Sequence, residues 1–407
     1  GHIAGHISWH QAPAHPWAAY TGQAPADCAA PSPTIHDDQA VLSVAAPSSQ
    51  LHARHGLLIA ADARIDDRDA LWATLRQAHH PAAPPPTREL LLRAYMRWGA
   101  TLGAHVLGDY AIAIWDAPRQ QLTLIRDAIG IRPLYYTSTS RGIAFASTVR
   151  ALLTHPHVEP QVNQTAVACF LHRASTGGHD TFFEGIRTVP PAHALVATPH
   201  GSSCQRYWEA EVTANLQPDD DIASAQGLRA VLTQAVHDRM GPRTSAAVSG
   251  GLDSSSIACL AHHSQPGGAP FPIFSATFPN LPASDLRKSD ERHYLHHLTR
   301  TGHFDEHECP VDHQNPAEEI DAAVRLLGAP PHICNLYLQR YIHRAARSAG
   351  CTVVLDGSEG DVAVSHGFGW LSELAATRQW ARFISEVHAL AHRMGGAQAP
   401  DLFWAFG

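Results

Sequence analysis

The segment that decides the fold reads Ser249-Gly250-Gly251-Leu252-Asp253-Ser254-Ser255-Ser256. Apolar residues 246–248 precede it, and the apolar segment 257–261 follows it. This order predicts a buried strand, a glycine turn and the start of a helix. Glycines permit a sharp turn with φ > 0 and expose backbone N–H groups, while a helix N-terminus carries partial positive charge. A phosphate or pyrophosphate group would therefore be held at this turn.

The turn differs from the Gly-x-x-x-x-Gly-Lys-Ser/Thr phosphate loop, because no lysine follows its glycines and Lys288 is the only lysine in the chain. An ordinary glycine turn capped by Asp253 is the alternative interpretation. The strand before the turn and the helix after it favour the anion site over that alternative.

A second apolar strand, residues 351–355, ends in the turn Asp356-Gly357-Ser358-Glu359-Gly360-Asp361. If the two strands are neighbours, Asp253 and Asp361 face one cleft. Two carboxylates beside a pyrophosphate repel each other unless Mg²⁺ lies between them and bridges carboxylate and phosphate oxygens. The pair therefore predicts bound Mg–ATP, with Asp253 and Asp361 as the metal ligands. Taken alone, this second turn could instead be a solvated acidic loop.

Length and composition set the limits of the fold. A chain of 407 residues with 44% hydrophobic residues can bury two cores, so we expect two domains of about 200 residues. The net charge of −8, without a basic stripe, argues against nucleic acid or an anionic membrane as the partner. We find neither a membrane-spanning apolar run nor a signal peptide and predict a cytoplasmic protein. Seven cysteines without a C-x-x-C pair indicate neither a disulfide framework nor a zinc site.

The two halves of the chain have different patterns. Short β-like segments at 56–60, 110–115, 121–125, 134–137 and 142–146 fill the first half, with an amphipathic helix at 88–98. An acidic linker at 209–221 separates it from alternating helices and strands. We expect helices at 222–240, 290–301, 316–327, 336–348 and 371–392, and strands at 245–248, 273–278 and 352–355. This alternation predicts a parallel sheet whose ligands bind beyond the carboxyl ends of its strands.

The chain resembles the asparagine synthetase superfamily over nearly its whole length. The second half carries the family's SGGLDSS loop at 249–255, its acidic step at Asp290-Glu291 and its glycine-acidic turn ending at Asp361. The first half resembles the family's glutaminase domain at 107–110, 126–136, 183–193 and 206–208. The resemblance implies an α/β protein: an αββα, Ntn-type glutaminase-like sandwich at 1–208, and a parallel-sheet ATP-pyrophosphatase domain, of the adenine nucleotide α-hydrolase type, at 209–407.

Departures from the family pattern suggest a lost glutaminase. Where the family begins Cys-Gly-Ile-x-Gly, with the cysteine as nucleophile, this sequence reads Gly1-His2-Ile3-Ala4-Gly5. Asp62-Ala63 stands in place of the family's glutamine-holding Asn-Gly pair. We expect a glutaminase-like domain without a nucleophile. Two branches of the superfamily lack this cysteine, the β-lactam synthetases and the lasso-peptide cyclases, and residues 355–367 with Ser365-His366-Gly367 look more like the cyclases.

The resemblance implies an ATP-dependent lasso-peptide cyclase that releases AMP and pyrophosphate. An Asp or Glu side chain of a precursor peptide would be adenylated, and the peptide's N-terminal amine would then attack to form an isopeptide bond. Candidates for the base are Glu359, Tyr337 and Tyr341. The adenine would lie near the backbone of Val248 and Thr277. The expected ATP and pyrophosphate ligands are Val248, Ser249, Gly250, Gly251, Asp253, Ser254, Ser255, Thr277, Gly357 and Ser358.

The cyclase interpretation implies a precursor peptide as substrate, with a leader-peptide-binding protein and a leader protease as partners. Alternatives are an asparagine synthetase-like or β-lactam synthetase-like ligase acting on a small substrate, or a non-catalytic scaffold in a peptide-modifying assembly. Relatives continue into a helical segment with a catalytic Lys or Arg. We expect either that Arg378 or Arg382 replaces this residue or that the chain lacks part of its site.

Overall fold

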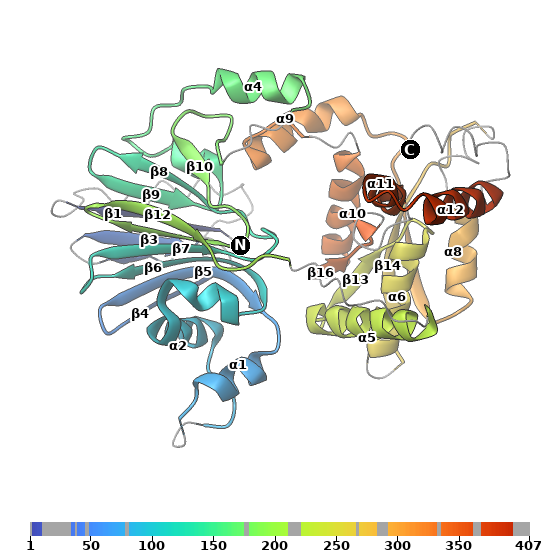
Figure 1. The fold of residues 1–407 in the computed structure, drawn as a ribbon, viewed down its shortest axis with the longest axis horizontal. Helices are drawn as coiled ribbons and strands as arrows, with labels where there is room; N and C mark the ends of the chain where they lie inside the picture. The colour runs from blue at the N-terminus through green and yellow to red at the C-terminus, as the bar shows by residue number, and fades with distance from the viewer. Residues whose placement is uncertain are drawn as a thin grey trace. The chain divides into compact units, whose positions relative to one another are not determined.

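The computed structural model describes residues 2–9, 34–36, 39–44, 49–77, 81–174, 179–210, 221–265, 268–282, 292–331, 335–360 and 368–393. The chain forms two compact units (Figure 1). The first comprises Gly1–Asp221 and Asn315–Leu336, and the second Ile222–Gln314 and Tyr337–Gly407. Residues 315–336 lie within the range expected for the second domain but belong to the first unit.

The first unit is built on two six-stranded antiparallel sheets. One sheet has the order β10 (Ile186–Thr188), β8 (Tyr135–Thr139), β9 (Gly142–Ala146), β1 (Ile3–Ser8), β3 (Ala40–Val44), β2 (Thr34–His36). The other has the order β12 (Gly201–Arg206), β11 (His193–Thr198), β7 (Gln121–Arg126), β6 (Gly108–Asp116), β5 (Leu57–Ile65), β4 (Ser49–Arg54).

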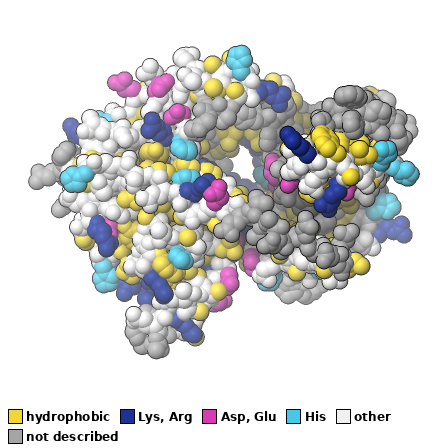
Figure 2. Space-filling view, viewed as in Figure 1, with side chains coloured by type: hydrophobic (Ala, Val, Ile, Leu, Met, Phe, Trp, Pro, Cys, Tyr) yellow, Lys and Arg dark blue, Asp and Glu magenta, His cyan; other side chains and the backbone are white. Residues whose placement is uncertain are grey.

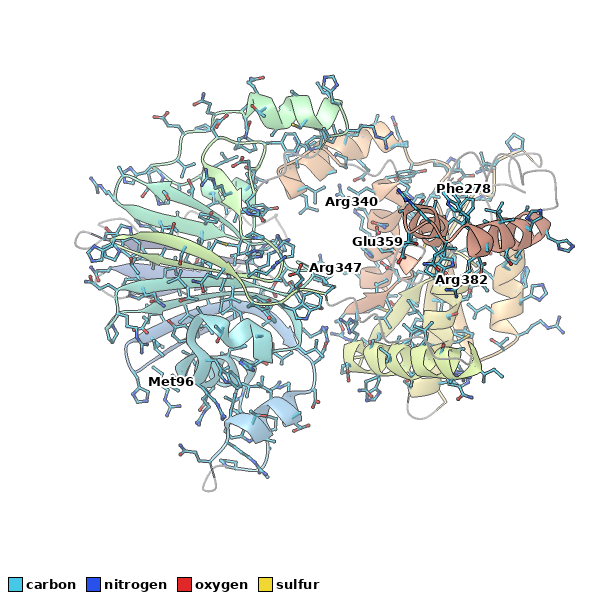
Figure 3. All side chains as sticks on the ribbon, in the orientation of Figure 1. Met96, Phe278, Arg340, Arg347, Glu359 and Arg382 are labelled. Atoms are coloured by element: carbon cyan, nitrogen blue, oxygen red, sulfur yellow. The ribbon has the colours of Figure 1, made fainter. Side chains whose placement is uncertain are left out.

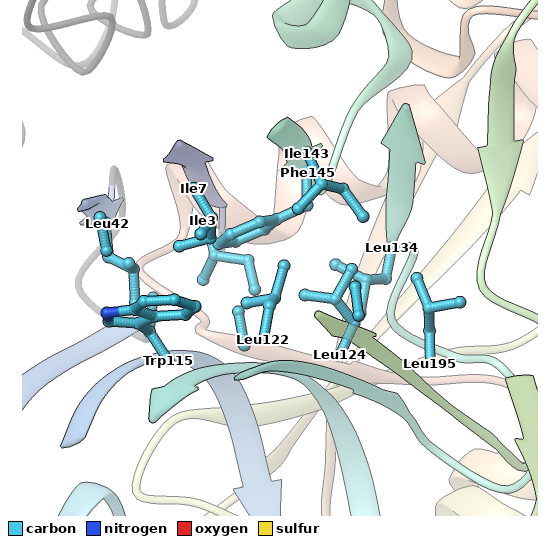
Figure 4. Packing of buried hydrophobic residues seen from close by; sticks show 14 of the residues in the cluster. Ile3, Ile7, Leu42, Trp115, Leu122, Leu124, Leu134, Ile143, Phe145 and Leu195 are labelled. Carbon is cyan, nitrogen blue, oxygen red and sulfur yellow. The ribbon is translucent and has the colours of Figure 1, made fainter. Parts of the chain in front are cut away.

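The two sheets pack face to face around one apolar core. Ile7 and Phe145 of the first sheet meet Trp115 and Leu122 of the second, and all four side chains are almost completely buried (Figure 4). A further core lies between the second sheet and its helices, and another beneath α3. The helical segments of this unit are α1 (Arg68–Leu75), α2 (Thr87–Trp98), η2 (Gly99–His105), α3 (Val149–Leu153), α4 (Gln164–Leu171) and α9 (Pro316–Leu327). This is the αββα sandwich expected from the sequence.

The second unit contains a four-stranded parallel sheet. Its order is β15 (Phe304–Pro310), β14 (Phe271–Thr277), β13 (Thr244–Ala247), β16 (Val353–Leu355). Helices cover both faces: Val236 and Ala258 pack on one face, and Ile342 and Ala346 on the other. The helices of this unit are α5 (Asp221–Arg239), α6 (Leu252–Ser264), α8 (Arg292–Thr299), α10 (Leu336–Ser348), α11 (Phe368–Ala376) and α12 (Trp380–Arg393). The expected parallel sheet is confirmed.

Two local expectations need correction. The single helix expected at 371–392 is two helices, because Arg378 adopts a left-handed conformation with φ 58° and the chain reverses between α11 and α12. Leu374 and Phe383 then pack together in a small core of this hairpin. The edge strand β15 was not expected, since its central residues are polar.

Two features of the described part of the chain concern the membrane and nucleic-acid partners considered above: the apolar length of its helices and the distribution of its charges. No helix there is both long enough and apolar enough to span a bilayer. On the face shown in Figure 2, basic and acidic side chains are interspersed. This distribution agrees with the absence of a basic stripe in the sequence.

Candidate active site

The glycine turn after β13 leads directly into α6, as the sequence predicts. Gly250 has φ 102°, a conformation that glycine adopts without steric cost. The N-cap of α6 is Gly251, which has no side chain to satisfy the first N–H groups of the helix. These N–H groups and the positive end of the helix therefore remain available to an anion.

The serines of this turn have different environments. Ser254 is buried, and its hydroxyl accepts a hydrogen bond from the Ser249 N–H at 3.3 Å and donates one to the Gly251 carbonyl at 3.3 Å. Ser249 is exposed, and its hydroxyl accepts from the Gly251 N–H at 3.2 Å. Ser254 thus holds the shape of the turn, whereas the Ser249 hydroxyl and the partly exposed Ser255 are open to a ligand.

The turn after β16 lies against the turn after β13. The two strands are parallel neighbours, with Ala246 paired to Leu355. A Cβ atom built on Gly357 would lie 2.6 Å from the Ser254 nitrogen, and one on Gly360 would lie 2.4 Å from Asp253 Oδ2. Only glycine permits this approach at either position. The structure therefore brings the two sequence motifs together at one edge of the sheet.

The acidic turn is shaped by its own backbone. The Asp356 carboxylate accepts from the Ser358 N–H at 3.0 Å, and the Gly360 N–H donates to the Gly357 carbonyl at 3.1 Å. Glu359 is exposed and has φ 65°, which is uncommon and unfavourable for a residue with a side chain. The turn thus presents the Glu359 carboxylate to solvent at the cost of local strain (Figure 3).

The donor set suits a magnesium ion that is bound together with phosphate. No three His, Cys, Asp or Glu side chains gather as metal ligands within the described ranges. Asp253 would therefore contribute one carboxylate, and nucleotide phosphates would supply further oxygens, which is the usual arrangement for Mg²⁺. Asp361, the second expected ligand, lies outside the described residues, as does the Asp290-Glu291 step.

Tyr337 and Tyr341 occupy successive turns of α10. Because a short connection joins the C-terminus of α10 to the start of β16, the helix begins towards the carboxyl edge of the sheet. Tyr341 packs against the core beneath α10 that contains Ile342 and Ala346. Tyr337 lies one turn earlier and is partly buried.

The two residues expected to lie beside adenine are buried. Val248 and Thr277 are 2% and 0% exposed. The Val248 N–H already donates to the Phe274 carbonyl at 2.9 Å, and the Thr277 carbonyl accepts from Val311 at 2.9 Å. Their side chains cannot reach a nucleotide, so only the remaining backbone groups at these strand ends are available.

Two arginines were expected to replace the catalytic Lys or Arg of the relatives' C-terminal helical segment, and the structure shows what each one contacts. Arg378 occupies the left-handed break between α11 and α12, and the Arg382 guanidinium lies 5.6 Å from the centre of the Trp370 ring. Arg340 lies one turn after Tyr337 on α10 and is partly buried (Figure 3).

In the first unit, the position of the family's Asn-Gly pair holds a buried carboxylate that is paired with a partly exposed arginine. Asp62 is 2% exposed, and its Oδ2 lies 3.5 Å from an Arg132 guanidinium nitrogen. Arg132 is held in place by the fully buried Asp127, whose carboxylate accepts from the N–H groups of Ile131 and Arg132 at 2.8 and 2.9 Å. Burial lowers the pKa of the nearby His2. This arrangement differs from the neutral amide site that the family uses for glutamine.

Comparison with known proteins gives two adjacent family matches. Residues 43–208 match the glutamine amidotransferase domain, and residues 227–403 match asparagine synthase. "Asparagine synthetase [glutamine-hydrolyzing] 3" of Bacillus subtilis is 29% identical over 266 residues, which cover 63% of this chain and 43% of that protein. "Asparagine synthetase [glutamine-hydrolyzing] 2" of the same organism is 26% identical over 338 residues, covering 76% and 43%.

A fungal relative has a different name. "Amidase chry2" of Gibberella zeae is 32% identical over 182 residues, which cover 43% of this chain and 26% of that protein. The matched part of this chain thus spans less than half the length of each of these relatives. The first half of the chain is thus similar to a glutamine amidotransferase domain, and the second half to asparagine synthase.

Proposed function

We propose that this chain is an ATP-dependent ligase that activates a carboxylate as an acyl-adenylate and joins it to an amine. The contact between the two motif turns, with Gly360 against Asp253 and Gly357 against Ser254, is the observation that carries this proposal. It creates one anion site with a metal-capable carboxylate at the carboxyl edge of a parallel sheet, where α/β proteins bind nucleotides.

Each part of this site has a distinct task in the proposed reaction. The substrate carboxylate attacks the α-phosphate of ATP, and pyrophosphate leaves towards the turn at 249–254. The exposed Ser249 hydroxyl and the first N–H groups of α6 stabilise the charge that develops on the leaving group. Mg²⁺ bound by Asp253 would neutralise phosphate charge. The amine then attacks the acyl carbon, and the bond from that carbon to the AMP oxygen breaks, so that AMP leaves. Tyr337 or Glu359 orients the amine and takes up the proton that it loses.

More specifically, we propose that the ligase is a lasso-peptide cyclase. The substrate is a precursor peptide whose Asp or Glu side chain is adenylated and then joined to the peptide's own N-terminal amine. A leader-peptide-binding protein and a leader protease would be its partners. The Asp62–Arg132 pair supports an amine source other than glutamine, because a buried carboxylate paired with arginine occupies the place of the family's amide site. The run Ser365-His366-Gly367 supports the resemblance to cyclases.

A second candidate is an asparagine synthetase-like ligase acting on a small acid, and the names of the two Bacillus relatives favour it. A β-lactam synthetase-like ligase shares the same adenylation chemistry. A non-catalytic scaffold would have no need for two glycines that hold the second turn against Asp253.

Mass spectrometry separates these candidates. The protein is incubated with Mg–ATP and a candidate precursor peptide, and in parallel with free aspartate plus ammonia or glutamine. A cyclase yields AMP, pyrophosphate and a peptide lighter by one water. Formation of asparagine in the parallel reaction would refute the proposed cyclase activity but would agree with the more general proposal of an ATP-dependent ligase. The absence of ATP–pyrophosphate exchange with every carboxylate tested would refute the ligase itself.

A further inference from the structure

Three histidines meet on the first sheet, on the face that points away from the core between the two sheets. His6 lies in β1 beside Ile7, which points into that core, and His155 and His157 lie in the turn 154–158 that follows α3. The ring centres of His6 and His155 are 4.9 Å apart, and those of His155 and His157 are 5.7 Å apart. His6 and His155 are buried, whereas His157 is exposed. The whole cluster belongs to the first unit.

The surroundings of His6 disfavour its charged form. Its Nε2 atom is buried and has no hydrogen-bond partner within the described part of the chain. The residues paired with His6 on the neighbouring strands β3 and β9 are the apolar Val41 and Ala144. The titratable groups around it are all positive when protonated: Arg141 in the turn between β8 and β9, His155 and His157. Burial, and then these neighbouring groups, lower the pKa of His6 and of His155 to about 4.

His155 helps to hold the turn 154–158 in its shape. Its Nδ1 accepts a hydrogen bond from the His157 N–H at 3.2 Å, and its carbonyl accepts one from the Val158 N–H at 3.0 Å. A protonated imidazole carries a proton on each nitrogen, so Nδ1 can accept only while His155 is neutral. Protonation would remove this hydrogen bond and place a positive charge beside the ring of His6. The closed turn therefore requires neutral His155.

The turn 154–158 is the part of this cluster that can move most easily. Because β1 is paired with β3 on one side and with β9 on the other, freeing His6 from its strand would require the sheet to open. In the turn, by contrast, Thr154, Pro156 and His157 are exposed. A surface segment with few buried contacts opens at a lower free-energy cost than a central strand does. Release of the turn would give both buried imidazoles access to water.

We propose that the turn 154–158 is an acid-sensitive latch, which is closed over His6 at neutral pH and is released from β1 when His6 and His155 become protonated. The latch does not depend on the proposed ligase function. In the released turn each histidine has its ordinary pKa of about 6.5 and binds a proton that the closed form excludes until about pH 4. Opening is therefore increasingly favoured as the pH falls from about 6.5 towards 4. Between about pH 7 and about pH 5, each histidine should raise the equilibrium constant for opening about 20-fold.

Hydrogen exchange tests the latch in the wild-type protein. The protection factor of the Val158 amide, in the latch, is compared with that of the Ile112 amide, in the central strand β6, at about pH 7 and about pH 5. The Val158 protection factor should fall by about 20-fold or more between the two pH values. It should also stay at least about tenfold below that of Ile112 at both, because the latch opens without global unfolding. A Val158 protection factor that does not fall, or one equal to that of Ile112, would overturn the proposal.

A pair of variants assigns the pH response to the cluster. His155→Gln keeps a side-chain acceptor but does not titrate, so the fall in Val158 protection between about pH 7 and about pH 5 should become about 20-fold smaller. The matched control is His200→Gln, since His200 is an exposed histidine between β11 and β12, and it should behave like the wild type. Equal falls in the two variants would overturn the proposal. The wild-type comparison decides the question by itself if His155→Gln does not fold.

Discussion

Replacing Gly360 with alanine should displace the Asp253 carboxylate from its place in the proposed nucleotide site. The added Cβ would lie 2.4 Å from Asp253 Oδ2 and 2.5 Å from its Cγ. Non-bonded carbon atoms prefer separations of about 3.5 Å, so the carboxylate must move by about 1 Å. Gly360 does not have a positive φ, and alanine therefore adds little backbone strain. The fold should survive while the metal-binding group is shifted.

The size of the effect follows from this displacement. A misplacement of about 1 Å in a catalytic site can lower the rate about 100-fold. At 25 °C this corresponds to about 2.7 kcal/mol of lost transition-state stabilisation. We expect a loss of this order in ATP–pyrophosphate exchange, together with a loss of the Mg²⁺ dependence of ATP-analogue binding measured by calorimetry.

A second glycine provides the control for this experiment. Gly369 in α11 has no atom within 4 Å of a built Cβ, so Gly369→Ala adds a methyl group in open space. This variant should exchange pyrophosphate and bind Mg–ATP like the wild type. If Gly360→Ala and Gly369→Ala behave alike, with the same exchange rate and the same metal dependence, the contact between the two turns does not shape the site and the reasoning is wrong.

Three further predictions follow from local structure. Because Glu359 has φ 65°, Glu359→Gly should raise the thermal midpoint of unfolding, whereas Glu359→Gln should not. A carboxylate that acts as the base makes both variants slower in amide formation than the wild type, and equal rates in all three proteins would exclude that role. Burial and neighbouring histidines lower the pKa of His6 and His155 to about 4. Below about pH 6.5 the unfolded chain therefore binds more protons than the folded chain does. The free energy of unfolding should have its full value above that pH and decrease as the pH falls towards 4. Urea unfolding at about pH 7 and about pH 5 measures this loss, which should be smaller in His155→Gln; an unchanged loss would contradict the assignment. Asp62→Ala removes the buried carboxylate that pairs with the partly exposed Arg132 and should lower the free energy of unfolding by about 1–3 kcal/mol in chemical denaturation. A loss within about 0.5 kcal/mol, as at ordinary surface sites, would show that the pair is unimportant.

The two motif turns could be predicted from sequence because local patterns encode them. An apolar strand followed by a glycine turn and a helix specifies its own conformation, and both motif turns follow such strands. The bounds of α10, Leu336–Ser348, agree with the expected helix for the same reason, since its amphipathic period is strong. Parallel pairing of β13 and β16 then places the two turns at one edge.

Features that depend on tertiary packing could not be predicted. The strand β15 has the polar residues Asp305 to Glu308 at its centre, and it is stable because it pairs with β14 at the edge of the sheet. The break at Arg378 requires a left-handed residue, which the amphipathic pattern of 371–392 does not signal. The contact of α9 with α3 depends on Gly328 lying against Val149, two residues that are distant in sequence. No local pattern carries such information.

A crystal structure with a non-hydrolysable ATP analogue and Mn²⁺ tests the central claim most directly. The anomalous signal should place the metal at coordination distance, about 2.1 Å, from an Asp253 carboxylate oxygen. The triphosphate should contact the turn at 249–254 and the turn at 357–360. A nucleotide bound elsewhere, or a metal that contacts neither Asp253 nor these turns, would contradict the account.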